Sequence, residues 1–183
     1  MALHLKPDQA LSNSELPAQH WCAQLALLLL NREWLLATSE SCTGGMIASQ
    51  CTDLAGSSAW FERGFVTYSN TAKTEMLGID PALIARHGSV SEAVALAMAS
   101  GALQHSHAQV AVAVTGVAGP TGGSPEKPVG TVWFAWATPG GLTSELHQFS
   151  GDRAAVRTAT VRHALHTLVH LLEQPASLND PEG

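Results

Sequence analysis

The chain has 183 residues, of which 45% are hydrophobic and only 13% are charged. This balance excludes a disordered chain and indicates one domain whose apolar surface lies in a core or a subunit interface, so we expect a homo-oligomer. The net charge of −6, with nine Lys and Arg residues in total, argues against a nucleic-acid-binding surface. The negative net charge is still compatible with a small anionic ligand, because one or two cations and a helix N-terminus suffice to bind a phosphate.

The cysteines and the hydropathy of the chain indicate its compartment. Cys22, Cys42 and Cys51 form no even-numbered framework and no CxxC motif, which predicts reduced thiols. The first twenty residues contain no basic-then-apolar signal segment, and the apolar run from Leu25 to Leu30 is too short to cross a bilayer. We therefore expect a cytoplasmic protein with no membrane partner.

Helical and strand patterns alternate along the chain. Apolar residues at helical spacing from Ser14 to Asn31 predict a first helix, and Pro17 suits its first turn. A short apolar run at 34–38 predicts a buried strand. The other expected elements are a helix at 43–52, a strand at 61–68, helices at 71–77, 81–86 and from Ser89 or Ser91 to about Gln104, a strand at 109–115, a loop at 116–128, strands at 129–138 and 142–149, and a helix at 153–172.

This order of elements predicts a three-layer α/β/α sandwich with a mixed, mostly parallel sheet. The turn Pro139-Gly140-Gly141 joins the last two strands into an antiparallel hairpin, which precedes the final helix. Residues 14–173 form the single expected domain, flanked by a flexible N-terminus at 1–13 and a flexible tail at 174–183.

Three irregular segments follow strands, and in open α/β sheets ligands bind beyond the carboxyl ends of parallel strands. In the first segment, Ser41 lies where a strand breaks into a helix, so its hydroxyl can cap the helix or attack a substrate. Spacing alone favours the cap. The three segments are 39–45, 68–73 and 115–127.

Lys73 and Tyr68 lie near the start of a second helix. The helix dipole and burial in a cleft both disfavour an ammonium at Lys73, so a neutral lysine there can act as a general base. Tyr68, the only tyrosine of the chain, ends the preceding strand, where its hydroxyl can relay a proton or orient the lysine. The alternative is a surface lysine and a half-buried tyrosine, and the residues alone favour that alternative.

The sequence also offers candidates for two other kinds of site, a cysteine nucleophile and a histidine metal site. Cys42 is a competing nucleophile, because a helix N-terminus lowers the pKa of a thiol. His163, His166 and His170 share one face of the last helix, but no carboxylate or cysteine joins them at ligand spacing, so we predict no metal site.

Six ordered blocks and Lys73 resemble the nicotinamide mononucleotide deamidase family, also known as the CinA carboxy-terminal domain. The resemblance extends from about residue 15 to residue 172, and we expect the stand-alone form, without the additional amino-terminal domain of longer relatives. The blocks are Ser-Glu-Ser-Cys-Thr-Gly-Gly (39–45), Gly-Ser-Ser-Ala-Trp-Phe-Glu-Arg-Gly-Phe-Val-Thr-Tyr-Ser-Asn (56–70), Val-Ser-Glu (90–92), Thr-Gly-Val-Ala-Gly-Pro (115–120), Lys-Pro-Val-Gly-Thr-Val (127–132) and Ser-Gly-Asp-Arg (150–153).

The resemblance implies hydrolysis of nicotinamide mononucleotide to nicotinate mononucleotide and ammonia, a step of pyridine nucleotide recycling that needs no metal or other cofactor. Carried over by motif, Ser41 is the nucleophile, Lys73 the base and Tyr68 their partner. Ser39 departs from the family pattern, in which alanine is more frequent. A non-catalytic nucleotide-binding or regulatory module is the alternative function.

The same resemblance suggests which residues bind the substrate and the oxyanion. The N–H groups around Thr43, Gly44 and Gly45 would hold the oxyanion. Arg153 is the candidate phosphate clamp, with a surface salt bridge as its alternative role. The full predicted binding set is Cys42, Thr43, Gly44, Gly45, Thr115, Gly116 and Arg153, with Thr115 and Gly116 near the ribose or phosphate.

Overall fold

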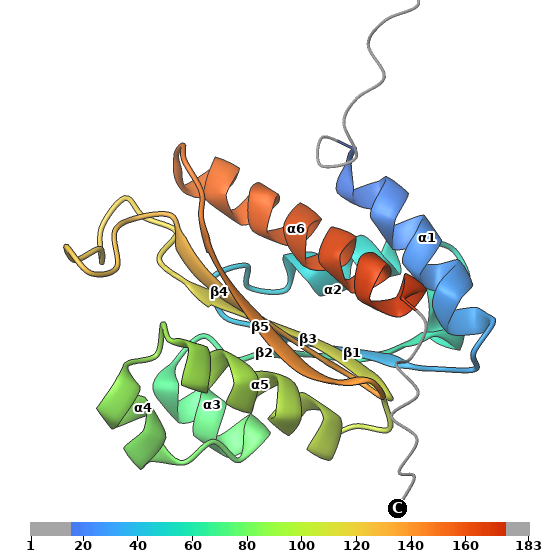
Figure 1. The fold of residues 1–183 in the computed structure, drawn as a ribbon, viewed down its shortest axis with the longest axis horizontal. Helices are drawn as coiled ribbons and strands as arrows, with labels where there is room; N and C mark the ends of the chain where they lie inside the picture. The colour runs from blue at the N-terminus through green and yellow to red at the C-terminus, as the bar shows by residue number, and fades with distance from the viewer. Residues whose placement is uncertain (1–15, 175–183) are drawn as a thin grey trace, which may run out of the picture.

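A five-stranded sheet in the order β2-β1-β3-β4-β5 forms the middle layer of the computed structural model (Figure 1). The structure describes residues 16–174, so the flexible ends predicted at 1–13 and in the tail beyond Gln174 lie outside the described residues. β1 pairs in parallel with β2 and β3, whereas β4 is antiparallel to both of its neighbours. The strands are β1 (Leu36–Glu40), β2 (Phe61–Val66), β3 (Val110–Gly116), β4 (Thr131–Thr138) and β5 (Gly141–Gln148).

Helices cover both faces of this sheet, with α1, α2 and α6 on one face and α3, α4 and α5 on the other (Figure 1). The predicted three-layer α/β/α sandwich with a mixed sheet and a hairpin before the last helix is confirmed. The helices are α1 (Ala18–Leu30), α2 (Met46–Thr52), α3 (Asn70–Leu77), α4 (Pro81–His87), α5 (Glu92–Gln104) and α6 (Arg153–Glu173), with a short 3₁₀ turn η2 (Ser57–Ala59). No helix between residues 16 and 174 combines the length and apolar character needed to cross a membrane.

Alternate residues of the central strand β3 face the two helical layers. Its valines pack with the core of the α1, α2 and α6 layer, and its alanines pack with the core of the α5 layer. The small alanines let α5 approach the sheet closely. On the other face, Trp136 donates from Nε1 to the carbonyl of Ala164 at 3.0 Å, which fixes α6 against the sheet. The start of α6, where Arg153 lies, is positioned by this docking.

Side chains cap the N-termini of four helices, α3, α4, α5 and α6. Ser69 accepts the N–H of Ala72 at α3, and Asp152 accepts the N–H of Ala155 at α6. Of the two candidate N-caps of α5, Ser89 and Ser91, the structure has Ser91, whose hydroxyl accepts the N–H of Val94. The helix that carries Lys73 and the helix that carries Arg153 therefore begin where the sequence places them.

The register of β1 brings the ends of three parallel strands together. Glu40, the last residue of β1, pairs with Val66 at the end of β2 and with Val114 in β3. The segments that follow these strands therefore meet at one edge of the sheet, as expected for a site at the carboxyl ends of parallel strands.

The first strand ends two residues later than the predicted range 34–38. Thr38, Ser39 and Glu40 all belong to β1 and are fully buried, because the strand lies in the sheet between β2 and β3. These polar residues resemble a loop in the sequence, but the ladder on both sides holds them extended. The irregular segment therefore starts at Ser41.

Candidate functional site

The buried Glu40 carboxylate caps α2. Its Oε2 accepts the N–H groups of Gly45 and Ile47, both at 3.0 Å, and its Oε1 accepts the N–H of Ala48 at 2.8 Å. A carboxylate at a helix N-terminus is stabilised both by these hydrogen bonds and by the helix dipole. The capping role considered for Ser41 is thus performed by its neighbour, and the Ser41 hydroxyl makes no cap hydrogen bond to α2.

The hydroxyl of Ser41 faces the amine of Lys73. Lys73 Nζ lies 3.1 Å from Ser41 Oγ and donates to the carbonyl of Thr67 at 2.8 Å. The lysine side chain extends from the first turn of α3 into the protein, where it is only 1% exposed. Within residues 16–174 it forms no ion pair. The pair has the geometry of a nucleophile and its base.

Burial lowers the pKa of Lys73, because removing an ammonium from water disfavours the charged form, while the nearby Cys42 thiol raises it. The burial effect is the larger of the two. A lowered pKa increases the fraction of neutral amine, whose lone pair can accept the Ser41 proton. The direction of this shift agrees with the electrostatics expected for Lys73, and its role as the base stays a prediction.

Cys42 differs from the expectation for a thiol at a helix N-terminus. Burial is the largest cause and raises the pKa of the Cys42 thiol to about 12, and the Glu40 carboxylate adds to the rise. A backbone hydrogen bond, Arg157 and Lys73 lower the pKa, but by less. The thiol is therefore protonated near neutral pH, and the prediction of a lowered pKa was wrong. Since the thiolate is the nucleophilic form, the structure disfavours a Cys42-based amidase.

The turn between β1 and α2 presents a small set of backbone donors. Gly44 and Gly45 have φ angles of 60° and 96°, in the left-handed region that favours glycine. Their N–H groups donate to the carbonyl of Ser41 and to Glu40, respectively. Among the described residues, the N–H groups of Cys42 and Thr43 donate to no acceptor. Of the predicted oxyanion donors, only the N–H of Thr43 is therefore left without an acceptor, and the N–H of Cys42, which was not among them, joins it as a candidate.

Arg157 of α6 holds this turn from the opposite side. Its Nε donates to the carbonyl of Cys42 at 3.1 Å and its Nη2 to the carbonyl of Thr43 at 2.7 Å. Because a trans peptide is planar, the Thr43 N–H points away from Arg157. The arginine thereby fixes the orientation of a candidate oxyanion donor.

Tyr68 does not join Ser41 and Lys73 by a hydrogen bond. Its hydroxyl instead accepts from Arg153 Nη2 at 2.9 Å, and its side chain is 62% exposed. Arg153 also donates from Nη1 to the carbonyl of Gly119 at 2.8 Å. The arginine considered for a surface salt bridge forms none within the described part of the chain. It links the tyrosine to the glycine-rich loop.

A cavity of about 630 Å³ lies beside this link. Arg153 and Arg157 both line it, so it carries two cations in a chain with net negative charge. Arg157 connects it to the Ser41 turn through the carbonyls that it holds. The other lining residues are Pro120, Val129, Gly151, Asp152 and Ala154. Size and charge suit the phosphorylated part of a nucleotide.

Thr115 and Gly116 have structural partners of their own. Thr115 Oγ1 donates to the carbonyl of Ser89 at 2.8 Å, which holds the segment before α5. A Cβ at Gly116 would lie 2.7 Å from the carbonyl oxygen of Thr131, so the close approach of β4 requires glycine. Neither residue lines the cavity beside Arg153. Their contact with ribose or phosphate stays a prediction.

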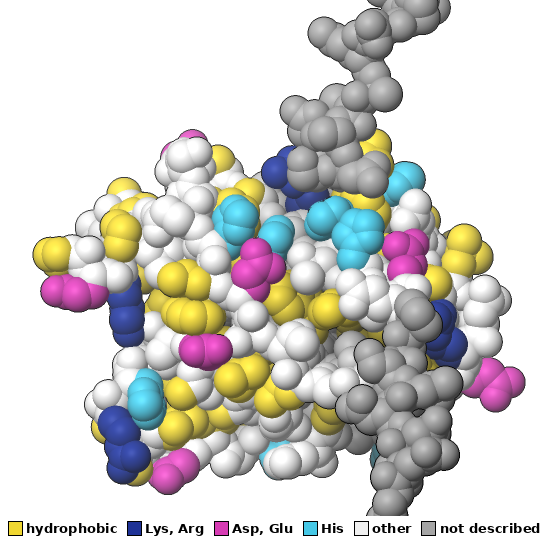
Figure 2. Space-filling model, in the orientation of Figure 1, with side chains coloured by type: hydrophobic (Ala, Val, Ile, Leu, Met, Phe, Trp, Pro, Cys, Tyr) yellow, Lys and Arg dark blue, Asp and Glu magenta, His cyan; other side chains and the backbone are white. Residues whose placement is uncertain are grey.

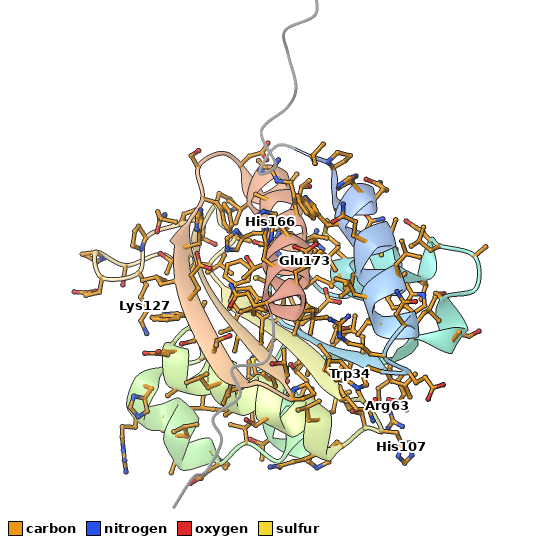
Figure 3. The ribbon with its side chains drawn as sticks, turned by 45° about the vertical axis from the view of Figure 1, so that its right-hand side comes forward. Trp34, Arg63, His107, Lys127, His166 and Glu173 are labelled. Carbon is orange, nitrogen blue, oxygen red and sulfur yellow. The ribbon has the colours of Figure 1, made fainter. Side chains whose placement is uncertain are left out.

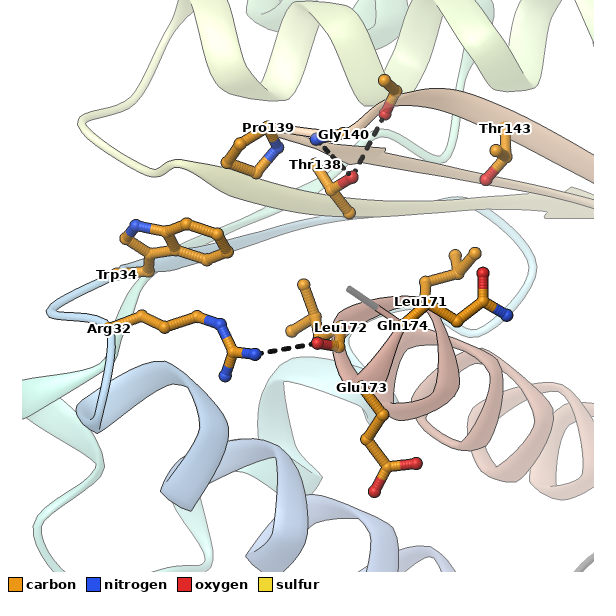
Figure 4. A pocket seen from close by; sticks show the side chains of 11 residues that line it. Arg32, Trp34, Thr138, Pro139, Gly140, Thr143, Leu171, Leu172, Glu173 and Gln174 are labelled. Carbon is orange, nitrogen blue, oxygen red and sulfur yellow. Dashed lines mark hydrogen bonds between the residues drawn. The ribbon is translucent and has the colours of Figure 1, made fainter. Parts of the chain in front are cut away.

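A second cavity, of about 500 Å³, lies at the other end of the sheet (Figure 4). Trp34, which precedes β1, and the Pro139-Gly140 turn line it together with the end of α6. Arg32 donates to the carbonyl of Leu172 at 2.9 Å across it. It lies at the amino end of β1, away from Ser41, and is not part of the candidate site.

Glu40, Arg157 and the carbonyl of Thr67 were not among the predicted site residues. Two signals could have found the side chains. Glu40 is a carboxylate within a buried apolar context immediately before the serine, and Arg157 follows Arg153 by four residues, which places both on one helix face. A backbone carbonyl has no sequence signal.

Replacing Glu40 with glutamine should lower the free energy of unfolding by about 2–4 kcal/mol, because the amide has one acceptor oxygen where three N–H groups need acceptors. Urea denaturation measures the change. Glu75→Gln is the matched control, since Glu75 is exposed on α3. Equal stability of the two variants would show that the cap contributes little.

The chain is similar to known proteins in sequence. Residues 18–172 match the model of the CinA C-terminal domain family. The nicotinamide-nucleotide amidohydrolase PncC of Escherichia coli (strain K12) is 55% identical over 146 residues, covering 79% of this chain and 88% of that protein. The Pseudomonas putida protein of the same name is 56% identical over 136 residues, covering 74% of this chain and 85% of that protein.

The fold also matches solved structures. The competence/damage inducible protein CihA from Agrobacterium tumefaciens superposes with a TM-score of 0.83 at 41% sequence identity. The superposition covers 91% of this chain and 99% of that one. Sequence and structure therefore point to the same relatives.

Proposed function

Because the chain belongs to the CinA C-terminal domain family, we propose that it hydrolyses the carboxamide of nicotinamide mononucleotide to nicotinate mononucleotide and ammonia. The relatives named nicotinamide-nucleotide amidohydrolase cover most of the chain at more than half identity, which supports an amidase of pyridine nucleotide recycling. The observation that carries the mechanism is the 3.1 Å approach of Lys73 Nζ to Ser41 Oγ.

The first step is the attack of Ser41 Oγ on the amide carbon. Lys73 accepts the hydroxyl proton as the C–O bond forms, which its lowered pKa favours. The carbonyl of Thr67 accepts a hydrogen bond from the same amine, so the lone pair is directed by a fixed partner. The Ser41 hydroxyl is free for this role because Glu40 caps the helix.

Negative charge then develops on the amide oxygen. The N–H groups of Cys42 and Thr43 are the donors that would hold it, a contribution of about 3–4 kcal/mol per donor in comparable enzymes. Arg157 keeps the turn in place through two carbonyls without contacting the oxyanion. The donors are thus oriented before the substrate arrives.

Collapse of this intermediate expels ammonia, which needs a proton. The Lys73 ammonium formed in the first step can supply it, and Tyr68 is the second donor near the site. Because the Tyr68 oxygen accepts from Arg153, its own proton is left for donation. Water then attacks the Ser41 ester with Lys73 again accepting a proton, and nicotinate mononucleotide is released.

The phosphate of the substrate fits the cavity between Arg153 and Arg157. We expect kcat/KM for nicotinamide riboside, which lacks the phosphate, to be roughly 30–100-fold below that for the mononucleotide, as for loss of one or two charged hydrogen bonds. Arg153→Gln should lower kcat/KM for the mononucleotide by a similar factor and should lower kcat/KM for the riboside less, because the riboside loses only the Tyr68 contact of Arg153 and no phosphate contact.

Ammonia release across nicotinamide, its riboside and its mononucleotide tests the proposal, with an EDTA control that should leave the rate unchanged. Tight binding of the mononucleotide without ammonia release would instead identify a non-catalytic nucleotide-binding module. Equal kcat/KM for riboside and mononucleotide would place the phosphate outside the arginine cavity.

A further inference from the structure

Outside the candidate site, histidines gather where β5 lies beside α6. Figure 2 shows His side chains grouped on this face around an acidic residue, and Figure 3 labels His166 on the same helix. Glu145 and His147 are two residues apart on β5, so their side chains point to the same face of the sheet. His163 of α6 meets them there: Glu145 Oε2 lies 3.1 Å from His163 Nε2, and Glu145 Oε1 lies 3.6 Å from His147 Nδ1.

We infer that Glu145, His147 and His163 form a binding site for a divalent transition-metal ion of the Zn²⁺ class. One ligand atom from each residue lies within 4.8 Å of the other two. Ligand atoms of a tetrahedral Zn²⁺ are about 3.4 Å apart, given bonds of 2.0–2.1 Å. The rings of His147 and His163 already lie 4.7 Å apart between centroids. Small side-chain rotations therefore bring the three atoms to bonding distance.

The ligand set selects the class of metal. Two imidazoles and one carboxylate suit Zn²⁺, Co²⁺, Ni²⁺ or Cu²⁺, whereas Mg²⁺ and Ca²⁺ prefer sites built only from oxygen. Three protein ligands leave one tetrahedral position for water. The partly exposed side chains of Glu145 and His147 give solvent access to that position.

The site is separate from Ser41. Glu145 of β5 is paired with Phe134 of β4. Phe134 is paired with Val114 of β3, and Val114 is paired with Glu40 of β1. Three strand spacings, about 14 Å, therefore separate Glu145 from Glu40. A metal here does not reach the reacting amide. It would fasten the edge strand β5 to α6, and so stabilise the fold.

A neighbouring histidine pair provides the internal comparison. His166 and His170 lie one turn apart on α6, with their Nε2 atoms 2.9 Å apart, and the imidazole of His170 lies 3.3 Å from Glu173. This pair can also contact a metal, but all its members belong to one helix. Metal binding there would not join β5 to α6.

The test titrates Zn²⁺ into the chelator-treated full chain, followed by calorimetry and by thermal unfolding. We expect one saturable Zn²⁺ ion and a rise in Tm of about 5 °C or more at a hundredfold excess over Kd. Glu145→Gln and His147→Asn should each weaken binding at least about tenfold, the lower limit for loss of even an outer partner of a metal site. Both lie on the exposed strand, whereas His163 packs against Phe134 and is avoided as a test position.

Two matched variants complete the experiment. His170→Asn and the exposed His87→Asn of α4 should retain the Zn²⁺ affinity of the parent chain. Co²⁺ should give visible absorption bands that vanish in His147→Asn. The inference is overturned if the parent chain shows no saturable binding, or if His170→Asn abolishes it while Glu145→Gln and His147→Asn retain it.

Discussion

Replacing Ser41 with alanine should lower the rate of ammonia release from nicotinamide mononucleotide by at least about 10⁴-fold, with the fold unchanged. The variant removes the hydroxyl that lies 3.1 Å from the buried Lys73 amine, and the Glu40 cap of α2 stays in place because it does not involve the serine side chain. Thermal unfolding and the initial rate of ammonia release measure the two properties on the same preparation.

Cys42→Ser is the matched control for this experiment. The Cys42 thiol has a pKa of about 12, so it is protonated in the working range of the protein and should not attack the substrate. Its replacement should therefore leave kcat close to that of the parent. An inactive but folded Cys42→Ser protein together with an active Ser41→Ala protein would assign the reaction to the thiol.

Replacing Lys73 with methionine should lower kcat by about 10²–10⁴-fold, the usual contribution of a general base. Methionine has a similar length and no charge, so the variant should stay folded, with a loss of about 1–3 kcal/mol because the Thr67 carbonyl loses its donor. Lys73→Arg should be as inactive, because a guanidinium stays protonated. Activity near that of the parent in Lys73→Met would exclude the lysine as the base.

The pH profile follows from the direction of the Lys73 shift. A base must be neutral to accept a proton, so kcat/KM should rise as pH increases through the pKa of Lys73 and level off above it. Because burial lowers this pKa, the rise should occur at a lower pH than that of an exposed lysine. The Lys73→Met variant should lose this limb of the profile.

The periodicity and capping residues of the chain predicted the layers of the fold, because each helix carries a local signal. The helices predicted at 71–77 and 153–172 are present, and Ser69 and Asp152 cap them. The end of β1 was missed by two residues, because Ser39 and Glu40 are polar residues that only their neighbours in the sheet hold extended. Burial of a carboxylate against a helix N-terminus is a tertiary effect.

In the candidate site, too, local motifs could be predicted from the sequence, whereas contacts between distant segments could not. Ser41 and Lys73 lie together as the motifs predicted, because both follow strands whose ends meet at one edge of the sheet. The partner of Tyr68 could not be predicted, since Arg153 reaches it from 85 residues further along the chain. The same holds for Arg157, whose contacts depend on how α6 docks on the sheet.

We propose that burial keeps the Lys73 amine ready to take the Ser41 proton. An NMR titration of the Lys73 side chain in the full chain tests this, with Lys73→Met used to assign the signal. Lys73 should titrate with a pKa clearly below that of ordinary lysines, and this pKa should coincide with the rising limb of the kcat/KM profile. A Lys73 that titrates with the exposed lysines, or above them, would contradict it.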